Sequence, residues 1–488
     1  IRVGMGRGSG AGSLVAWSLK ITDVNPITNG LLFERFLNPE RVSMPDFDID
    51  FDPDDRERVI EYVRVRYGHE RVTMISAFGR ILSKSAIDLA ARSIALSGGN
   101  GTGDVQISGF NDTSRVRSFI PEGPGADSSL NTLISEIPEF KAMVDEDAKI
   151  RLLIKAAMLV EGLHSHQTKH AAGVVIGGDD LYKMFPVIRD RKEMSLMSAY
   201  DMKGTESVGA VKFDFLGLKN LSIIKLSLTL MREAGITEDI DMSFNDDGVY
   251  ALLREGLTQG VFQFSSAGMV NALQLVRPDK FAEIVAILAL YRPGPMKYLD
   301  SFAARKLGRE KVIYPLARYA VSNKTVDMTK EGAIEFSREH GLSDIIQDIE
   351  QADTLDDLVK SSAERLNEVA LSQGKTLRDN PSWPKVGNKM EETMSETYGY
   401  FIYQEQVMQV ARDAAGYTYA GADMLRRAMG KKIREEMARQ KSIFIEGCAN
   451  NGVSEYDATT LFDDIERFAD YGFNKSHAVA YAVVCYQT

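Results

Sequence analysis

The chain has 488 residues, of which 44% are hydrophobic and 26% charged, and its net charge is −11. These values are ordinary for a globular protein and predict roughly three domains at about 150 residues each. No apolar stretch approaches the roughly 20 residues of a membrane helix, no leader opens the chain, and Cys448 and Cys485 are too few for a disulfide framework. We therefore expect a cytoplasmic protein with buried thiols and no membrane contact. It is expected to be a fragment of a longer chain, since element interiors run up to both ends.

A glycine-rich segment at 6–13 runs into an apolar stretch that predicts a helix. Glycines let backbone N–H groups approach phosphate, and the N-terminus of a helix favours anions. Ser9 adds a hydroxyl, and Arg7 adds a guanidinium that can hold phosphate through two hydrogen bonds. The segment lacks the Gly-Lys-Ser/Thr ending of a Walker loop, so a phosphate-binding loop and a flexible turn both stay open.

Polar and apolar residues alternate over 42–52, which predicts a β-strand. Because residues i and i+2 lie about 6.6 Å apart on one face of a strand, Asp46, Asp48 and Asp50 share a face and the apolar residues between them face the core. Aligned carboxylates repel one another, and Mg²⁺, which prefers oxygen ligands, removes that cost. Two such ions are the known device for phosphoryl transfer, but the spacing does not select which two aspartates bind metal.

Two other interpretations compete with a metal site at this strand. A solvated acidic edge would explain exposed aspartates, but not the bulky apolar residue at each alternate position. A calcium loop would use the same aspartates together with Glu57, but its sixth position requires glycine for a sharp turn and is Phe51 here. Metal-dependent phosphoryl transfer is therefore favoured.

Further along the chain, helices are predicted over 54–67 and 150–165, and a strand over 208–216. In that strand Asp214 and Lys212 share a face, because they are two residues apart. An aspartate beside a lysine suits a site that handles a triphosphate. Asp214 is therefore a candidate third metal ligand.

Three histidines between 164 and 170 precede a short buried strand predicted over 172–177. Neither a cysteine nor a carboxylate completes a familiar zinc spacing around them. His170, beside Lys169, fits a contact with backbone or phosphate better. A further histidine, His477, lies beside a helix of small residues, where it either faces substrate or caps the helix.

The net negative charge argues against a nucleic-acid-binding protein, but it does not describe local fields. A helical run predicted over 400–448 carries Arg426, Arg427 and Lys431, and the last two share a helix face because they are four residues apart. Acidic residues are sparse until Glu435. The first half of this run is therefore expected to present unpaired positive charge.

Nine motifs, in this order, resemble the alpha subunit of bacterial DNA polymerase III, the family-C replicative polymerase. Each motif is short, but the ordered set spans nearly the whole chain and is specific. The motifs are GRGSGAGS (6–13), FERFLNPER (33–41), PDFDIDF (45–51), KHA (169–171), KFDFLGL (212–218), YRPGP (291–295), YQEQVM (403–408), GADMLRRAMGKK (421–432) and YGFNKSH (471–477).

The resemblance implies an α+β fold: a nucleotidyltransferase palm like that of polymerase beta, a mainly helical thumb and large helical fingers. The palm would comprise 1–77 and 160–220, with the thumb at 78–159 inserted between them and the fingers at 221–488. Residues 315–390 are longer than the usual link between their flanking motifs and form an atypical, mainly helical insertion.

The resemblance also implies roles for single residues. Asp46, Asp48 and Asp214 match the catalytic aspartates that hold two Mg²⁺ ions, which makes Asp50 a supporting residue. The residues expected to bind the nucleotide are Arg7, Gly8, Ser9, Arg35, Arg426, Arg427 and Lys431, and those expected at the primer or its phosphates are Lys212, Lys169, His170 and His477.

The function implied is that of a DNA-directed DNA polymerase acting in replication, with primer-template DNA and dNTPs as partners. The sliding clamp and the proofreading subunit are expected partners of the family, but the regions that bind them are absent from this sequence. Two alternatives stay open: a nucleotidyltransferase that modifies a small molecule or an RNA end, which would not need residues 221–488, and a truncated fragment that only binds primer-template DNA.

Overall fold

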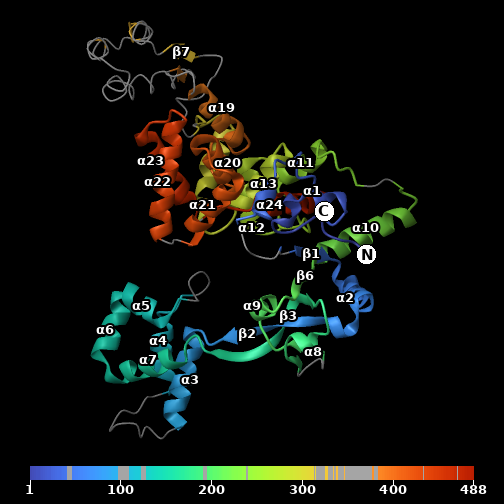
Figure 1. Cartoon of the computed structure of the whole chain (residues 1–488), viewed down its shortest axis with the longest axis vertical. Helices are drawn as coiled ribbons and strands as arrows, with labels where there is room; N and C mark the ends of the chain where they lie inside the picture. The colour runs from blue at the N-terminus through green and yellow to red at the C-terminus, as the bar shows by residue number, and fades with distance from the viewer. Residues whose placement is uncertain are drawn as a thin grey trace. The chain divides into compact units, whose positions relative to one another are not determined.

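The protein has a mixed α and β structure that divides into two compact units (Figure 1), as seen in a computed structural model. Unit 1 comprises Ile1–Val59 and Asp214–Thr488, and unit 2 comprises Ile60–Phe213. The chain therefore leaves unit 1 once and returns to it. The structure describes residues 1–40, 45, 47–96, 109–121, 128–190, 195–237, 240–312, 314, 325–327, 334, 337–338, 346, 376–378, 383–431, 434–469 and 471–488.

Unit 2 contains the strands β3, β2, β5 and β4, which are neighbours in that order in the sheet, and the first part of β6 (Val211–Gly217), which lies next to β3. The long strands β2 (Val72–Arg80) and β3 (His164–Ile176) pair antiparallel, and β5 (Leu196–Ser198) pairs parallel with β2 and antiparallel with β4 (Val187–Arg189). The strand expected at 172–177 thus begins much earlier, because its polar first half finds a partner in β2. The remaining elements here are η3 (His69–Arg71), α8 (Leu181–Met184) and α9 (Met202–Ser207).

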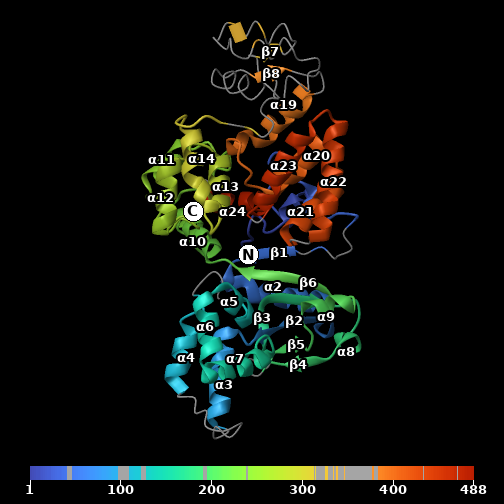
Figure 2. The same ribbon diagram turned by 90° about the vertical axis from the view of Figure 1, so that its left-hand side faces the viewer.

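Five helices of unit 2 pack around a core of their own (Figure 2). On α7, Ile150, Leu153, Ile154 and Ala157 are buried on one face, as expected for apolar residues at spacings of three and four. Burial of each of the three larger side chains, Ile150, Leu153 and Ile154, contributes roughly 1.5–3 kcal/mol. These helices are α3 (Ser83–Leu96), α4 (Gly109–Arg117), α5 (Leu130–Glu136), α6 (Pro138–Glu146) and α7 (Ala148–Val160).

The helix expected over 54–67 is confirmed as α2 (Pro53–Tyr67), along which the chain passes from unit 1 to unit 2. The helix expected over 150–165 ends at Val160, since β3 begins at His164. The strand expected over 208–216 is β6 (Val211–Gly217), along which the chain returns to unit 1.

The amino-terminal part of unit 1 contains short elements around one strand. They are η1 (Gly10–Gly12), α1 (Leu14–Ser18), η2 (Phe33–Arg35) and β1 (Phe47–Phe51). In the sheet order β1 lies next to β6. The helix predicted after the glycine segment is therefore confirmed, although it has five residues.

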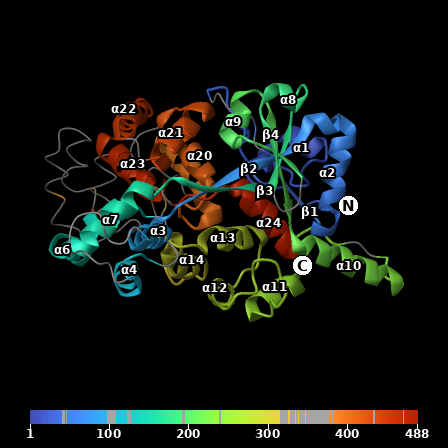
Figure 3. The ribbon, with the colours of Figure 1, turned by 90° about the horizontal axis from the view of Figure 1, so that it is seen from below.

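A first helical core of unit 1 surrounds the carboxy-terminal helix α24 (Lys475–Gln487) (Figure 3). Helix α13 packs along α24 and is apolar on nearly all sides, as expected for a helix buried in a core. The other elements of this part are α10 (Lys219–Glu233), α11 (Asp247–Glu255), α12 (Ala267–Val276), α13 (Phe281–Leu290), η4 (Pro295–Tyr298) and α14 (Leu299–Lys306).

A second helical core of unit 1 contains the run expected over 400–448. Within that run α20 and α21 are separate helices, and the break between them falls at Gly416, whose φ of +72° is a left-handed conformation that ends a helix. The elements are α19 (Trp383–Met394), η6 (Ser395–Thr397), α20 (Gln404–Ala415), α21 (Tyr419–Lys431), α22 (Arg434–Asn450) and α23 (Glu455–Ala469).

Most of the insertion predicted at 315–390 lies outside the described residues. Within it, β7 (Thr325–Asp327) pairs parallel with β8 (Thr376–Arg378). Cys448 and Cys485 are buried free thiols, as expected. Among the helices of the described chain, none has both the length and the apolar character needed to span a bilayer.

Candidate active site

The amino-terminal segment lies along the acidic strand β1. The Gly4 N–H donates to the Asp50 carbonyl at 2.7 Å, and Val3 and Phe51 form an antiparallel bridge. A Cβ added to Gly4 would lie 2.8 Å from the Asp50 Cβ, so the close approach requires glycine. Gly8 has a φ of +60°, and a Cβ added there would lie 3.1 Å from Asp48 Oδ2. The glycine segment therefore brings its backbone against the Asp48 carboxylate.

Asp50 lies in the interior, whereas the solvated acidic edge considered for this strand would leave it exposed. It is 3% exposed, and its Oδ1 pairs with Arg7 Nη1 at 3.1 Å. The Tyr481 hydroxyl donates to Asp50 Oδ2 at 3.4 Å and also accepts from Arg7. Burial raises the pKa of Asp50, against the opposing effect of Arg7. Asp50 can be buried because Arg7 and Tyr481 give its carboxylate partners.

Helix α24 meets the glycine segment through His477. The Gly8 N–H donates to His477 Nδ1 at 3.3 Å, and the His477 ring lies 4.1 Å from the ring of Tyr481. Burial lowers the pKa of His477 to about 4, and Arg7 and Arg292 add to the effect. The imidazole is therefore neutral near pH 7, and its proton is on Nε2, because Nδ1 accepts a hydrogen bond. The side chain that caps α24 is Asn474.

Asp48 and Asp214 lie on neighbouring strands of unit 1. Next to them, the rings of Phe51 and Phe215 meet edge to face at 5.4 Å, and the Leu218 N–H donates to the Phe51 carbonyl at 2.9 Å. Paired strands lie about 4.8 Å apart, so the strands that carry these two carboxylates are adjacent in the sheet. Carboxylate oxygens are the donors that Mg²⁺ prefers.

The third predicted metal ligand, Asp46, lies outside the described residues. Within the described ranges, no group of three or more His, Cys, Asp or Glu side chains is arranged to hold a metal ion. Asp48 and Asp214 fit a magnesium site in donor chemistry, and the third ligand is not described.

Two predicted nucleotide-binding arginines converge on one side chain. Gln404 Oε1 accepts from Arg35 Nε at 2.9 Å and from Arg426 Nη1 at 3.5 Å. Arg426 also donates through Nε and Nη2 to Asp423 Oδ1, at 2.9 and 2.7 Å. The expectation of unpaired positive charge is therefore wrong for Arg426, whose partner is three residues earlier on α21. Arg427 is partly buried, and the side chain of Lys431 lies outside the described residues.

The segment before α24 is held by two of the motifs. The Gln404 N–H donates to the Phe473 carbonyl at 2.8 Å, and the Phe473 N–H donates to the Ile402 carbonyl at 3.0 Å. Arg292 donates through Nη2 to the Tyr471 carbonyl at 2.9 Å, and its guanidinium lies 4.2 Å from the Phe473 ring centroid. These contacts set the direction from which α24, and hence His477, reaches the glycine segment.

Two family models match the chain. The model described as the bacterial DNA polymerase III alpha NTPase domain matches residues 1–217, and the model described as the bacterial DNA polymerase III alpha subunit finger domain matches residues 220–331 and 344–452. This chain belongs to the family of bacterial DNA polymerase III alpha subunits.

Curated relatives agree with this assignment. The DNA polymerase III subunit alpha of Rickettsia felis is 39% identical over 498 aligned residues, which cover all of this chain and 34% of the relative. The subunits from Deinococcus radiodurans and Thermus aquaticus are 38% and 37% identical, and the match covers all of this chain and 31% and 34% of their lengths. The chain therefore spans about a third of the length of these family members.

Unit 2 supplies the predicted primer-contacting residues Lys169, His170 and Lys212. In the β2–β3 pair, residues 170–173 lie opposite Ile75 alone, because the register shifts between Met74 and Ser76. His170 Nδ1 accepts from the Ala172 and Gly173 N–H groups at 3.2 and 2.8 Å, which satisfies donors that the shift takes out of the ladder. Lys169 is partly buried and Lys212 is buried.

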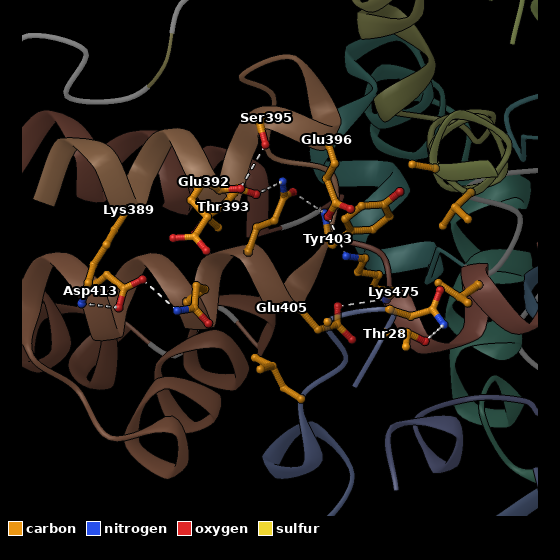
Figure 4. Close-up of a pocket in the computed structure, with 18 of the residues that line it drawn as sticks. Thr28, Lys389, Glu392, Thr393, Ser395, Glu396, Tyr403, Glu405, Asp413 and Lys475 are labelled. Carbon is orange, nitrogen blue, oxygen red and sulfur yellow. Dashed lines mark hydrogen bonds and ion pairs between the residues drawn. The ribbon is translucent and has the colours of Figure 1, made fainter. Parts of the chain in front are cut away.

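A cavity of about 680 Å³ lies in unit 1 beside the start of α24 (Figure 4). Lys475, the first residue of α24, donates through Nζ to Glu396 at 2.6 Å and through its backbone N–H to Glu405 Oε2 at 2.9 Å. Glu405 is buried, and burial raises its pKa. The cavity is lined by none of the residues predicted to bind nucleotide or metal, so it is separate from the site at Asp48.

Sequence reasoning missed Gln404, Tyr481 and Arg292. Tyr481 was open to discovery, because it follows His477 by four residues and so shares its helix face. Gln404 and Arg292 lie in motifs that carry the family resemblance. Their place in these motifs indicated that they are important. Their contacts could not be predicted, because the residues that they contact are too far away in the sequence for a helix or strand period to relate them.

Proposed function

We propose that this chain carries the polymerising site of a DNA-directed DNA polymerase that acts in replication. The observation that best supports this proposal is the close approach of the Gly8 backbone to Asp48. Arg7 of the same segment is bound by Asp50 and Tyr481, and Gly8 is bound by His477. Membership of the family supports this proposal. The palm, thumb and fingers, with the boundaries predicted from the sequence, are part of it.

In the proposed reaction the primer 3′ hydroxyl gives its proton to solvent, and its oxygen forms a bond to the α-phosphorus of a dNTP. The bond from that phosphorus to the bridging oxygen breaks, and pyrophosphate leaves with that oxygen. Asp46, Asp48 and Asp214 would hold two Mg²⁺ ions, which when bound would lower the pKa of the primer hydroxyl and neutralise phosphate charge.

The remaining predicted residues would bind and orient the substrates. Backbone N–H groups at Gly8 and Ser9 would donate to phosphate oxygens, as flexible glycine segments allow. The guanidinium groups at Arg7, Arg35 and Arg426 would give charged hydrogen bonds to the triphosphate, with Arg427 and Lys431 on the same helix. The neutral Nε2–H of His477 would give a further donor, and Lys212, Lys169 and His170 would contact the primer or its phosphates.

Primer-template DNA and dNTPs are the proposed partners of this chain, in the cytoplasm. For the whole protein, the sliding clamp and the proofreading subunit are proposed as well. Their contacts would lie in the part of the family's length that this chain does not span.

A primer-extension assay tests the proposed function. The chain is mixed with a gapped DNA, all four dNTPs and Mg²⁺, with controls that lack template or contain EDTA. Extension that depends on template and on magnesium is expected. Binding of the DNA without extension would instead support a truncated, catalytically incompetent fragment.

A further inference from the structure

The inference concerns Gln404, the first residue of α20, and rests on the proposed function. Its side-chain oxygen is a shared acceptor: Arg35 from the η2 segment donates at 2.9 Å, and Arg426 from α21 donates at 3.5 Å. Hydrogen bonds from both groups to one oxygen hold the two guanidinium groups close together. Two cations at such short range repel each other.

The amide nitrogen of Gln404 sets the orientation of its side chain. Nε2 donates to the Gly472 carbonyl at 3.1 Å, and the backbone N–H donates to the Phe473 carbonyl at 2.8 Å. Because Nε2 must face a carbonyl, Oε1 must face the arginines. The amide thus ties two arginines, from segments far apart in the sequence, to the loop that leads into α24.

The acceptor is neutral, and this matters for an anionic substrate. A glutamate at this position would have the same size and would bind both guanidinium groups more strongly. It would also compete with phosphate for them. An amide oxygen orients both groups and adds no negative charge. Asp423, which pairs with Arg426 from three residues earlier on α21, is 1% exposed.

We infer that Gln404 is a positioning residue for the incoming nucleotide: its neutral side-chain oxygen holds Arg35 and Arg426 in the arrangement that receives the triphosphate. Gln404 acts through the two arginines and makes no contact with the reacting atoms. A negative charge at this position weakens nucleotide binding more than loss of the amide does.

Two near-isosteric variants separate this role from a purely structural one. Gln404→Met and Gln404→Glu both lose the Nε2 donor to Gly472, and Gln404→Met also loses the oxygen that accepts from the arginines. A purely structural role therefore predicts a loss in Gln404→Met at least as large as that in Gln404→Glu. The inference predicts that dNTP affinity falls about tenfold or more in Gln404→Glu, the size expected when a charged hydrogen bond is lost, and by only a few fold in Gln404→Met. Gln274→Glu, on an exposed position of α12, is the control for added charge and keeps the wild-type affinity.

Affinity is measured by calorimetry with a dNTP and Mg²⁺, and KM and kcat by primer extension. A rise in KM with little change in kcat is expected for Gln404→Glu. Equal affinity losses in the two Gln404 variants, unchanged affinity in Gln404→Glu, or no dNTP binding by the wild type would overturn the inference. Wild-type binding without extension would count against the proposed function while the order of affinities still tests Gln404.

Discussion

His170 and His477 use the same ring nitrogen in different ways. In unit 2, His170 Nδ1 accepts from residues two and three positions later in its own strand. In unit 1, His477 Nδ1 accepts from Gly8, which is 469 residues earlier. The first contact repairs a local irregularity in a sheet. The second joins a carboxy-terminal helix to the segment beside Asp48, so equal local chemistry serves stability in one unit and site assembly in the other.

The largest effect is expected at the centre of the unit 1 site. Asp48→Asn removes a charge at the proposed metal site and should lower the primer-extension rate by about a thousandfold or more, as removal of a central catalytic group does. Thermal unfolding should stay near that of the wild type, because Asp48 is only partly buried. Full extension by Asp48→Asn would refute the proposed mechanism.

A matched pair of substitutions tests the comparison directly. His477→Ala should lower extension by roughly ten- to a hundredfold, since it releases Gly8 and removes a buried donor. His170→Ala should instead lower the free energy of unfolding by about 1–3 kcal/mol, because two backbone donors lose their acceptor. Urea unfolding measures the free energy of unfolding of both variants, and single-turnover extension measures their activity. The comparison would be contradicted if His170→Ala left the free energy of unfolding unchanged.

The pH dependence of stability sharpens the role of His477. Its folded pKa is about 4, below the ordinary value near 6.5 for the unfolded chain. As pH falls, the unfolded state therefore binds the proton before the folded state does. The stability that comes from burying the neutral His477 imidazole is fully present above pH 6.5 and is lost as pH falls towards 4. The loss amounts to about 3 kcal/mol at most.

Urea titrations between pH 4 and pH 7.5 measure this dependence. His477→Gln should remove that part of the pH slope, while Tyr481→Phe, which keeps the imidazole, should retain most of it. Identical slopes for the wild type and His477→Gln would contradict the burial argument.

Alanine substitutions at two glycines with left-handed backbones distinguish the cost of backbone strain from the effect of a Cβ contact with Asp48. Gly8→Ala should cost about 1–2 kcal/mol for its φ of +60°, and should also lower extension because the new Cβ meets Asp48 Oδ2. Gly235→Ala, at a φ of +81° with no atom within 4 Å of its Cβ, should cost only the strain. Equal extension rates in the two variants would show that the contact at Asp48 has no consequence for activity.

The smallest effect is expected at a helix cap in unit 2. Asp147 caps α7 by accepting from the Lys149 N–H at 2.9 Å. Asp147→Ala should cost about 1 kcal/mol of stability and leave the affinity for dNTP unchanged. A change in dNTP affinity would contradict the comparison, because it would show that a loss of stability in unit 2 alters nucleotide binding.

Elements with strong local patterns were predictable. Helix α2 and strand β6 were predicted within a few residues of their observed bounds. The ion pair between Asp423 and Arg426 was also within reach of a spacing rule, because the two residues lie three apart on one helix. The division into palm, thumb and fingers came from the family resemblance and stays a prediction.

From the sequence we could infer which chemistry the chain offers: carboxylates in a strand, a glycine segment and arginines on a helix. Which of these groups meet is a property of the folded chain. Arg35 and Gln404 are 369 residues apart, and Arg7 and Tyr481 are 474 apart. No period of a helix or strand relates positions so distant. Asp50 could become a buried ion-paired residue only because packing of α24 against the glycine segment brings Tyr481 and Arg7 to it, and that packing depends on the whole core of unit 1.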